Sequence, residues 1–412
     1  MKLAKMSLAA ALLLGMNAYA VENVEVSGDA KLFYGTQSGS YDSSATSEAL
    51  FNKSGAYADF SASLGVTADL MENVKAGAKM QLISTLGLEN DIVSGTWSSG
   101  HKANSGVLNT DEWVSEAWLE GKLGATTGKV GRMTLETPLV FTETWSSDYN
   151  TFEAAMLTNE DIPDTTLVAA YVATSNGYAA DPSGTLVGNV MSGGGTFYKV
   201  GEEGAYVLGA INNSVKPLTV QGWYYSMPKT ADAYWLQADL EMDGIIAGAQ
   251  YTSINVDDAV ATGDDDTAYA FKLGYAIPDM MTITAAYSAV ADTGTYGGVY
   301  NFATAGQSAG TASSLYTEYW WWFQTASATG ATTMTLSAEG SVSDVDLFLG
   351  YYTTDTKPAG SDTDTTSEVA FTASKSFGPL DTSIALLYDM FDYAVGDSED
   401  LMTVQLYFTY NF

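Results

Sequence analysis

One stretch of the chain concentrates the charged side chains that could act on a passing solute. It begins with two cations, Lys129 and Arg132, and continues with four carboxylates, Glu136, Glu143, Asp148 and Glu153. Carboxylates placed around a narrow passage select cations. Three of the six, Glu136, Glu143 and Asp148, fall in a connection between two predicted strands, so their chemistry depends on whether that loop enters a pore.

The sequence does not indicate a hydrolytic site. His101 is the only histidine, and it lies in a stretch rich in serine, glycine and asparagine. A nucleophile needs a base that a third group orients, and the closeness in sequence of Ser99 and Ser105 does not establish that arrangement. The chain contains no cysteine, so no cysteine or histidine cluster marks a transition-metal site. We therefore expect a protein that is not an enzyme.

Acidic residues also cluster in three other stretches, Asn255–Asp258, Gly263–Asp266 and Asp362–Glu368. Hard cations such as calcium prefer oxygen groups of this kind. None of the stretches has the twelve-residue EF-hand spacing with its central glycine. Solvated acidic loops are the favoured interpretation, and loop-bound calcium is the alternative. No other cofactor or metal is indicated.

The elements that must position these side chains are strands with a period of two. In the last twelve residues, Leu401–Phe412, every second residue counted back from the terminus is apolar. That length crosses a hydrocarbon core as a tilted strand. A lone strand would leave unpaired N–H and C=O groups in lipid, which only a closed barrel satisfies. The pattern predicts an all-β, transmembrane antiparallel β-barrel, and a strand of a soluble sandwich is the alternative.

The same alternation recurs along the chain and predicts about 18 strands. They are expected at Val24–Tyr34, Ala56–Leu70, Val74–Thr85, Glu112–Leu123, Ala125–Thr134, Thr151–Asn159, Thr165–Thr174, Thr196–Ile211, Leu218–Met227, Ala233–Met242, Ile245–Ile254, Thr267–Ile277, Met281–Val290, Thr332–Val342, Val345–Thr354, Ser367–Phe377, Thr382–Phe391 and Leu401–Phe412. Tight turns such as Asp243-Gly244 alternate with longer polar loops, as in outer-membrane barrels. The segment from Gly201 to Gly204 interrupts the eighth strand.

The connection from 291 to 331 holds an aromatic run, Tyr319–Phe323, with tryptophan at its three central positions. Aromatic residues are enriched at the edges of a bilayer. An interfacial girdle or a packed loop is therefore the favoured interpretation, and a platform on which sugars stack is the alternative. Whether this connection is one long loop or contains a hairpin stays open.

The first 20 residues have the features of a secretory signal peptide. Lys2 and Lys5 precede an apolar run, and Ala18-Tyr19-Ala20 forms a cleavage site. The expected organisation is a signal peptide at 1–20 and one barrel domain at 21–412. Two of the 16 basic residues and none of the 49 acidic ones lie in the signal peptide, which leaves 14 against 49. This excess of negative charge disfavours nucleic acid as a partner and attracts cations.

The alternation also assigns side chains to the inside of the barrel. The charged residues predicted to line the lumen include Asp29, Lys31, Asp59, Lys79, Glu116, Glu120, Asp239, Lys272, Asp346 and Asp389. The outward sets hold almost no charge, as insertion into lipid demands. A barrel of about 18 strands is too wide to be filled by its wall side chains alone. A hydrated and negatively biased lumen suits a water-filled channel.

Several segments resemble a known family. Gly131–Leu139, Thr151–Ala155 and Asp161–Leu167 are similar to the porin family that includes outer-membrane porin D, the Opr family. Ser314–Trp321 resembles the major outer membrane porins of epsilonproteobacteria. The resemblance implies an 18-stranded barrel in the bacterial outer membrane with a third loop folded inward as a constriction, and it suggests a homotrimer. Outer-membrane lipid, lipopolysaccharide and the barrel-assembly machinery are the implied partners.

The end of the chain carries a further resemblance. Phe408, Tyr410 and the terminal Phe412 alternate on one face, and this arrangement resembles the recognition signal of bacterial outer-membrane barrels. We therefore expect these three residues to support assembly.

The chain departs from the porin D branch in its charge. Pores of that branch line their constriction with several arginines for acidic substrates, whereas Arg132 is the only arginine here. The expected function is thus an outer-membrane diffusion channel for small hydrophilic solutes and ions, with a preference for cations. A substrate-specific channel and a structural or adhesive barrel with a closed lumen are the alternatives.

Overall fold

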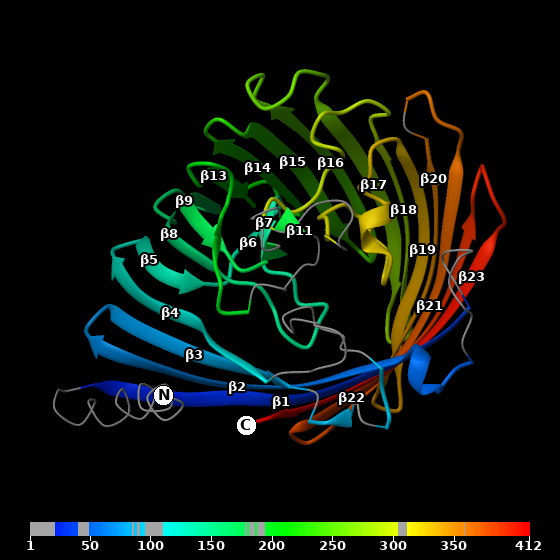
Figure 1. The fold of residues 1–412 in the computed structure, drawn as a ribbon. Coiled ribbons are helices and arrows are strands. Elements are labelled where there is room, and N and C mark those ends of the chain that lie inside the picture. Colours follow the sequence, from blue (N-terminus) through cyan, green and yellow to red (C-terminus); the bar gives the residue numbers. More distant parts are fainter. Residues whose placement is uncertain are drawn as a thin grey trace.

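The computed structural model describes residues 21–39, 49–84, 86–88, 91–94, 110–177, 179–180, 186–187, 194–303, 311–357 and 359–412. The predicted signal peptide lies outside these ranges, as do His101, Ser99 and Ser105. Within them the chain forms a closed antiparallel barrel of 18 strands (Figure 1). The predicted fold class is confirmed.

Each barrel strand pairs with the next one in the chain, and the last pairs with the first. The strands are β1 Glu22–Gly39, β2 Ala56–Met71, β3 Val74–Ser84, β4 Asp111–Leu123, β5 Thr126–Met133, β8 Phe152–Asn159, β9 Thr165–Ser175, β13 Ala205–Asn212, β14 Leu218–Met227, β15 Ala231–Met242, β16 Ile245–Val256, β17 Asp266–Ile277, β18 Met281–Val290, β19 Ala331–Val342, β20 Val345–Thr356, β21 Asp364–Phe377, β22 Leu380–Asp392 and β23 Glu399–Asn411. The short elements are β6 Glu136–Thr137, β7 Val140–Phe141, β10 Ala179–Ala180, β11 Leu186–Val187, β12 Tyr198–Lys199 and the 3-10 helices η2 Lys53–Gly55 and η5 Phe323–Thr325.

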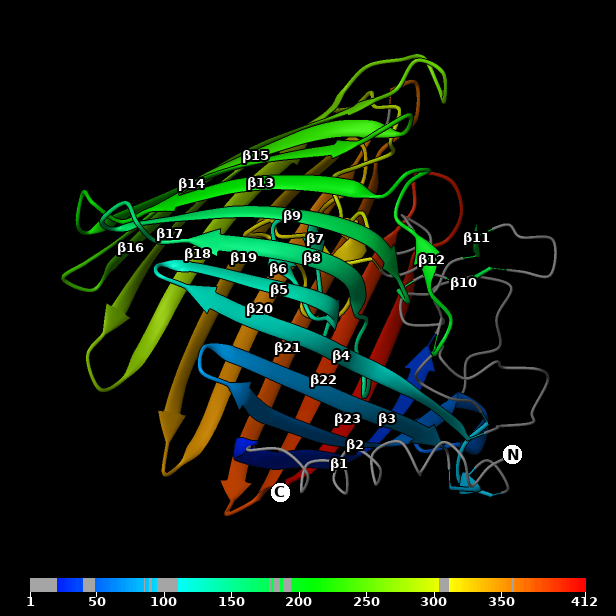
Figure 2. The same ribbon diagram turned by 90° about the vertical axis from the view of Figure 1, so that its left-hand side faces the viewer.

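Short turns and longer connections alternate along the barrel. The short turns gather at one end of the tilted strands, which we call the turn end, and the opposite end is the loop end (Figure 2). Two loop-end connections matter below. Loop 3, residues 134–151, joins β5 to β8, and loop 7, residues 291–330, joins β18 to β19. The described part of loop 7 forms no hairpin of barrel strands, only an isolated bridge and η5.

The eighth strand is interrupted where the sequence predicts it. β12 and β13 both pair with β9, and residues 200–204 separate them. Gly201 and Gly204 there adopt left-handed φ angles of 65° and 85°, which a glycine adopts without steric cost. The chain therefore bends between β12 and β13 while both segments stay paired with β9.

Strand β4 contains an irregularity that the alternation misses. Lys79 of β3 lies opposite Glu116, but the next residue, Met80, lies opposite Val114, so Ser115 is an extra residue. Such a bulge reverses which face the following residues occupy. Strict alternation puts Glu112 on the same face as Glu116. The structure instead pairs Glu112 with Leu82, which lies on the opposite face of β3 from the inward Lys79, so Glu112 faces outward. Only the residues from Glu116 onward follow the predicted pattern.

The outer and inner faces differ as a lipid-embedded barrel requires. Large apolar side chains such as Leu208, Leu273 and Leu336 are exposed on the outside. The largest buried apolar cluster instead joins the inner faces of β8, β9 and β13–β18 to residues of loops 3 and 7, among them Leu139, Phe302 and Leu315. One side of the interior is therefore packed with loop residues. Among the described residues, no helix has the length and apolar character needed to cross a membrane.

Candidate functional site

Loop 3 folds into the barrel, as predicted, and touches three separated strands. The Leu139 N–H donates to the Tyr225 hydroxyl of β14 over 3.2 Å. At the other side, the Ser61 hydroxyl of β2 donates to the carbonyl of Ser147 over 2.8 Å. The Tyr149 hydroxyl donates to Glu116 of β4 over 3.1 Å. The loop thus crosses the interior and is fixed to the wall on both sides.

Loop 7 also lies inside the barrel and holds loop 3. The Phe302 N–H donates to the carbonyl of Leu139 over 2.8 Å, and the Asn301 side chain donates to the carbonyl of Phe141 over 2.8 Å. Trp145 of loop 3 packs against Phe323 of loop 7, with ring centres 5.4 Å apart. The candidate constriction is therefore built by two loops, whereas the sequence pointed to loop 3 alone.

Two of the four predicted constriction carboxylates are buried between these loops. Glu143 is 2% exposed and accepts hydrogen bonds from the Asn301 side chain at 2.9 Å and the Trp145 indole at 2.8 Å. Asp148 is also 2% exposed and accepts a hydrogen bond from the Ser146 hydroxyl at 3.1 Å. These positions differ from the expectation that both line an open passage. The contacts of Glu143 join loop 3 to loop 7, whereas Asp148 is bonded within loop 3.

Arg132 of β5 and Glu153 of β8 form a pair, but not in the passage. Their chain neighbours Met133 and Phe152 are buried in the inner cluster, so the register places Arg132 and Glu153 on the outer face near the loop end, contrary to the expectation that they lie at the constriction. The Arg132 guanidinium donates to a Glu153 carboxylate oxygen over 2.7 Å, and it also donates to the carbonyl of Val114 beside the β4 bulge. Its other face stacks on Phe197, 3.8 Å from the ring centre. Lys129 lies further along β5, with its ammonium group 4.0 Å from the ring centre of Trp118.

A charged group joins the walls formed by β1 to β4. Asp29 lies 3.8 Å from the ammonium group of Lys31 and 3.9 Å from that of Lys79. Lys79 also lies 5.1 Å from the ring centre of Tyr149, whose hydroxyl reaches Glu116. Four of the predicted lumen residues are thus brought together against loop 3.

A second charged group lies on the wall formed by β15 and β17. Asp239 lies 2.7 Å from the ammonium group of Lys272 and accepts a hydrogen bond of 2.7 Å from the hydroxyl of Tyr316 in loop 7. The same ammonium group lies 4.3 Å from the centre of the Tyr316 ring. This pair therefore anchors loop 7 to the wall opposite the first group.

The other predicted residues are scattered. Asp59 and Asp389 are fully buried on the inner wall. Glu120 and Asp346 line two separate polar grooves at the turn end, of about 510 and 580 Å³. Glu136, in β6, is exposed, and desolvation by the surrounding loop raises the pKa of its carboxyl group above the ordinary value.

Two further wall carboxylates, Asp266 and Glu368, hold loop 7. Asp266 of β17 accepts hydrogen bonds from the N–H groups of Tyr296, Gly297 and Gly298 at 2.6 to 3.0 Å. Glu368 of β21 accepts hydrogen bonds from the N–H groups of Trp320, Trp321 and Trp322. The tryptophan run therefore lies inside the barrel as part of a packed loop, away from any outer aromatic girdle. In the sequence Glu368 is the end of an acidic stretch, and nothing local in the sequence indicated its partners in loop 7.

In the acidic stretches considered for calcium, some carboxylates accept hydrogen bonds from other groups of the chain. Asp265 accepts a hydrogen bond from the Asn255 side chain at 2.6 Å, and Asp364 accepts one from the Ala394 N–H at 2.8 Å. In the part of the chain that the structure describes, no three carboxylate, histidine or cysteine groups converge as a metal site requires. Calcium at these loops has no support from this arrangement.

The predicted assembly residues lie on the outer face of β23 and at its end. Phe408, Tyr410 and Phe412 are 41%, 49% and 58% exposed. Phe412 continues the pairing of β23 with β1 through hydrogen bonds to Gly28.

The fold is shared with solved outer-membrane channels. The structure of OccK9 (OpdG) from Pseudomonas aeruginosa superposes with a TM-score of 0.70 at 15% identity, covering 95% of this chain and 99% of that one. OccAB1 from Acinetobacter baumannii gives 0.71 at 14% identity, with 96% and 97% covered. OpdK from Pseudomonas aeruginosa, in a structure with vanillate, gives 0.69 at 11% identity, with 95% and 99% covered. No protein-family model and no curated protein sequence matches the chain.

Proposed function

We propose that the protein is an outer-membrane diffusion channel for small hydrophilic solutes and ions, with a preference for cations, and that it is not an enzyme. A closed 18-stranded barrel with an apolar outer face and charged inner walls supports a role in a membrane that accepts β-barrels. The fold shared with the Occ channels supports the same role.

One observation supports the proposed preference for cations. The inner cations Lys31, Lys79 and Lys272 each lie within 4 Å of a carboxylate, which offsets their charge, and Lys122 and Lys129 are the two inner cations without an ion pair in the described structure. The carboxylates Glu116, Glu120, Glu136 and Asp346 form no ion pair with any residue that the structure describes. The local balance is therefore negative, and low-dielectric walls focus such a field.

A planar-bilayer recording in a potassium chloride gradient tests the proposal. We expect a reversal potential of the sign that potassium permeation gives. It should be larger at low salt, because salt screens the wall charges and the screening length falls to about 10 Å at 0.1 M. A reversal potential of the chloride sign would refute the cation preference. Failure to form any conducting pore would instead favour the structural or adhesive barrel.

A substrate-specific channel is the second candidate. Lys79 and Lys129 each lie against an aromatic ring on the β3–β5 side of the lumen, an arrangement suited to contact with a ring-bearing or anionic solute. Conductance that saturates as one solute is added would favour this candidate. A linear response to every solute would favour general diffusion.

The remaining assignments belong to the same proposal. Residues 1–20 act as a cleaved export signal, and residues 21–412 form one barrel domain. The barrel inserts among outer-membrane lipid and lipopolysaccharide with the help of the barrel-assembly machinery, and it associates as a homotrimer. Crosslinking in native membranes, followed by electrophoresis, tests the trimer. A band at the size of the monomer and none at the size of a trimer would count against it.

A further inference from the structure

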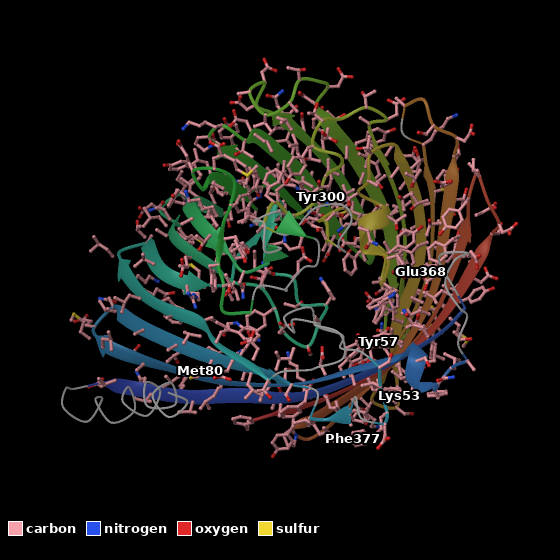
Figure 3. All side chains as sticks on the ribbon, in the orientation of Figure 1. Lys53, Tyr57, Met80, Tyr300, Glu368 and Phe377 are labelled. Atoms are coloured by element: carbon pink, nitrogen blue, oxygen red, sulfur yellow. The ribbon has the colours of Figure 1, made fainter. Side chains whose placement is uncertain are left out.

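Glu368 holds the tryptophan run of loop 7 by its backbone. The N–H groups of Trp320, Trp321 and Trp322 donate to its two carboxylate oxygens over 3.0 to 3.2 Å. Glu368 is fully buried on the inner face of the wall (Figure 3). Successive N–H groups that converge in this way form a site for an anion. Glu368 is therefore the charged partner of the loop.

A second carboxyl group lies beside Glu368 on the next strand. Asp389 of β22 is directly opposite Glu368 in the strand register and is also fully buried. Its carboxyl group faces that of Glu368 and approaches the Trp322 indole. Among the described residues, neither Asp389 oxygen has a hydrogen bond of normal geometry.

The surroundings of this pair supply no cation. The titratable groups that face it are Tyr352 of β20, Tyr57 of β2 and Tyr319 of loop 7, and Glu318 of loop 7 lies near Tyr352. The Tyr319 hydroxyl is occupied elsewhere, since it donates to the carbonyl of Thr366 over 2.7 Å and accepts from the hydroxyl of Thr354 at 2.9 Å. No lysine, arginine or histidine in the described ranges forms an ion pair with either carboxylate.

Two adjacent carboxylates without a cation repel each other, whereas one proton between them makes a charge-assisted O–H···O hydrogen bond. Glu368 already accepts from three N–H groups. The proton therefore belongs on Asp389, which accepts none.

We propose that Glu368 is the positioning residue for the tryptophan run and that Asp389 supports it as a neutral hydrogen-bond donor. Together they hold loop 7 folded inside the barrel. The consequence for permeation rests on the proposed channel function, because a released loop changes what passes through the pore. The positioning itself does not depend on that function and can be measured separately.

The chain contains no cysteine, so a single introduced cysteine reports on loop 7. We place it at Gln324, in η5 next to the tryptophan run, and measure its rate of reaction with a maleimide in the folded barrel. A cysteine at exposed Ser361 serves as the reference site. Its labelling rate corrects for the reactivity of the maleimide and for the effect of pH on the thiol reaction itself. The variants compared are Glu368→Gln, Asp389→Asn and, as a matched control, Glu339→Gln on β19.

Glu368→Gln puts an amide NH2 where the loop needs an acceptor, so the labelling rate should rise about tenfold or more. Asp389→Asn keeps a donor toward Glu368, so the rate should stay at the wild-type value, as should that of the control. Raising the pH removes the proton from Asp389 and should speed labelling of the wild type but not of Asp389→Asn. A merely structural role for the pair does not predict this difference.

An unchanged rate in Glu368→Gln, or an equal rise in Asp389→Asn, would overturn the proposal. If Glu368→Gln does not fold, Trp321→Pro removes one of the three donors from the loop side and should also speed labelling. Bilayer recordings of the same variants form a separate readout. Faster labelling without any conducting pore would refute the channel function and leave the positioning role intact.

Discussion

Phe412 and Gly28 join the two ends of the barrel. The Gly28 N–H donates to the carbonyl of Phe412 over 2.8 Å, and the Phe412 N–H donates back to the carbonyl of Gly28 over 3.0 Å. A Cβ atom at position 28 would clash with the carbonyl oxygen of Ser63 and lie 2.6 Å from the edge of the Phe412 ring. The last residue of the chain thus packs on a strand residue that has no side chain.

The first prediction concerns this closing contact. Deleting Phe412 removes both hydrogen bonds and the ring contact, and Gly28→Val displaces the ring, so both changes should lower the yield of folded, heat-modifiable barrel. Phe271→Ala is the control, because Phe271 is similarly exposed, at 53%, but lies on β17, away from the closure between β1 and β23. Equal yields of the three variants would contradict a special role for Phe412.

The second prediction concerns selectivity. Neutralising Glu116, Glu120 and Glu136 together as glutamine keeps their size and removes three inner charges that have no ion-pair partner in the described structure. The reversal potential in a potassium chloride gradient should move toward zero, with a smaller change in conductance. Replacing Asp257, Asp258 and Asp264 with asparagine removes the same number of charges from an exposed loop. This control should change the reversal potential less. If the loop variant has the larger effect, the outer acidic loops set selectivity.

The third prediction concerns Arg132. Its guanidinium joins Glu153, the Val114 carbonyl and the Phe197 ring. Arg132→Gln should lower the free energy of unfolding by about 1.5–3 kcal/mol, the usual range for hydrogen bonds to a charged group. Because Arg132 lies on the outer face, the reversal potential should stay close to that of the wild type. Urea denaturation and reversal potentials measure the two effects. Lys122→Gln removes an equal charge that forms no ion pair in the described part of the inner wall, and should leave stability unchanged.

The fourth prediction concerns pH. Burial raises the pKa of Glu318 in loop 7 well above its ordinary value of 4.5, and the nearby charge of Glu143 acts in the same direction. Above pH 4.5 the folded protein therefore holds a proton that the unfolded chain has lost. Stability should fall as pH rises from there toward the folded pKa.

Glu318→Gln removes this dependence. Its urea midpoint should fall less with pH than that of the wild type, whereas Asp258→Asn, at an exposed position, should follow the wild type. Parallel curves for the wild type and Glu318→Gln would show that this carboxyl group does not contribute.

The strands and their number were accessible from the sequence by itself. A strand that separates lipid from a hydrated interior must alternate apolar and polar residues, and this requirement holds locally in every strand. The pattern thus identified all 18 strands, including the eighth with its glycine interruption. It failed locally in β4, because the extra residue Ser115 changes the face without leaving a mark in composition.

Only the tertiary structure decided the arrangement of the interior. Glu143 and Asn301 are 158 residues apart in sequence and share a buried hydrogen bond, and Glu368 holds three tryptophans 46 to 48 residues away. Loops 3 and 7 have no periodicity that a pattern could detect. Their carboxylates looked like solvated or pore-lining charges until the fold supplied their donors. A carboxylate's role depends on which distant N–H groups surround it, and folding alone brings those groups together.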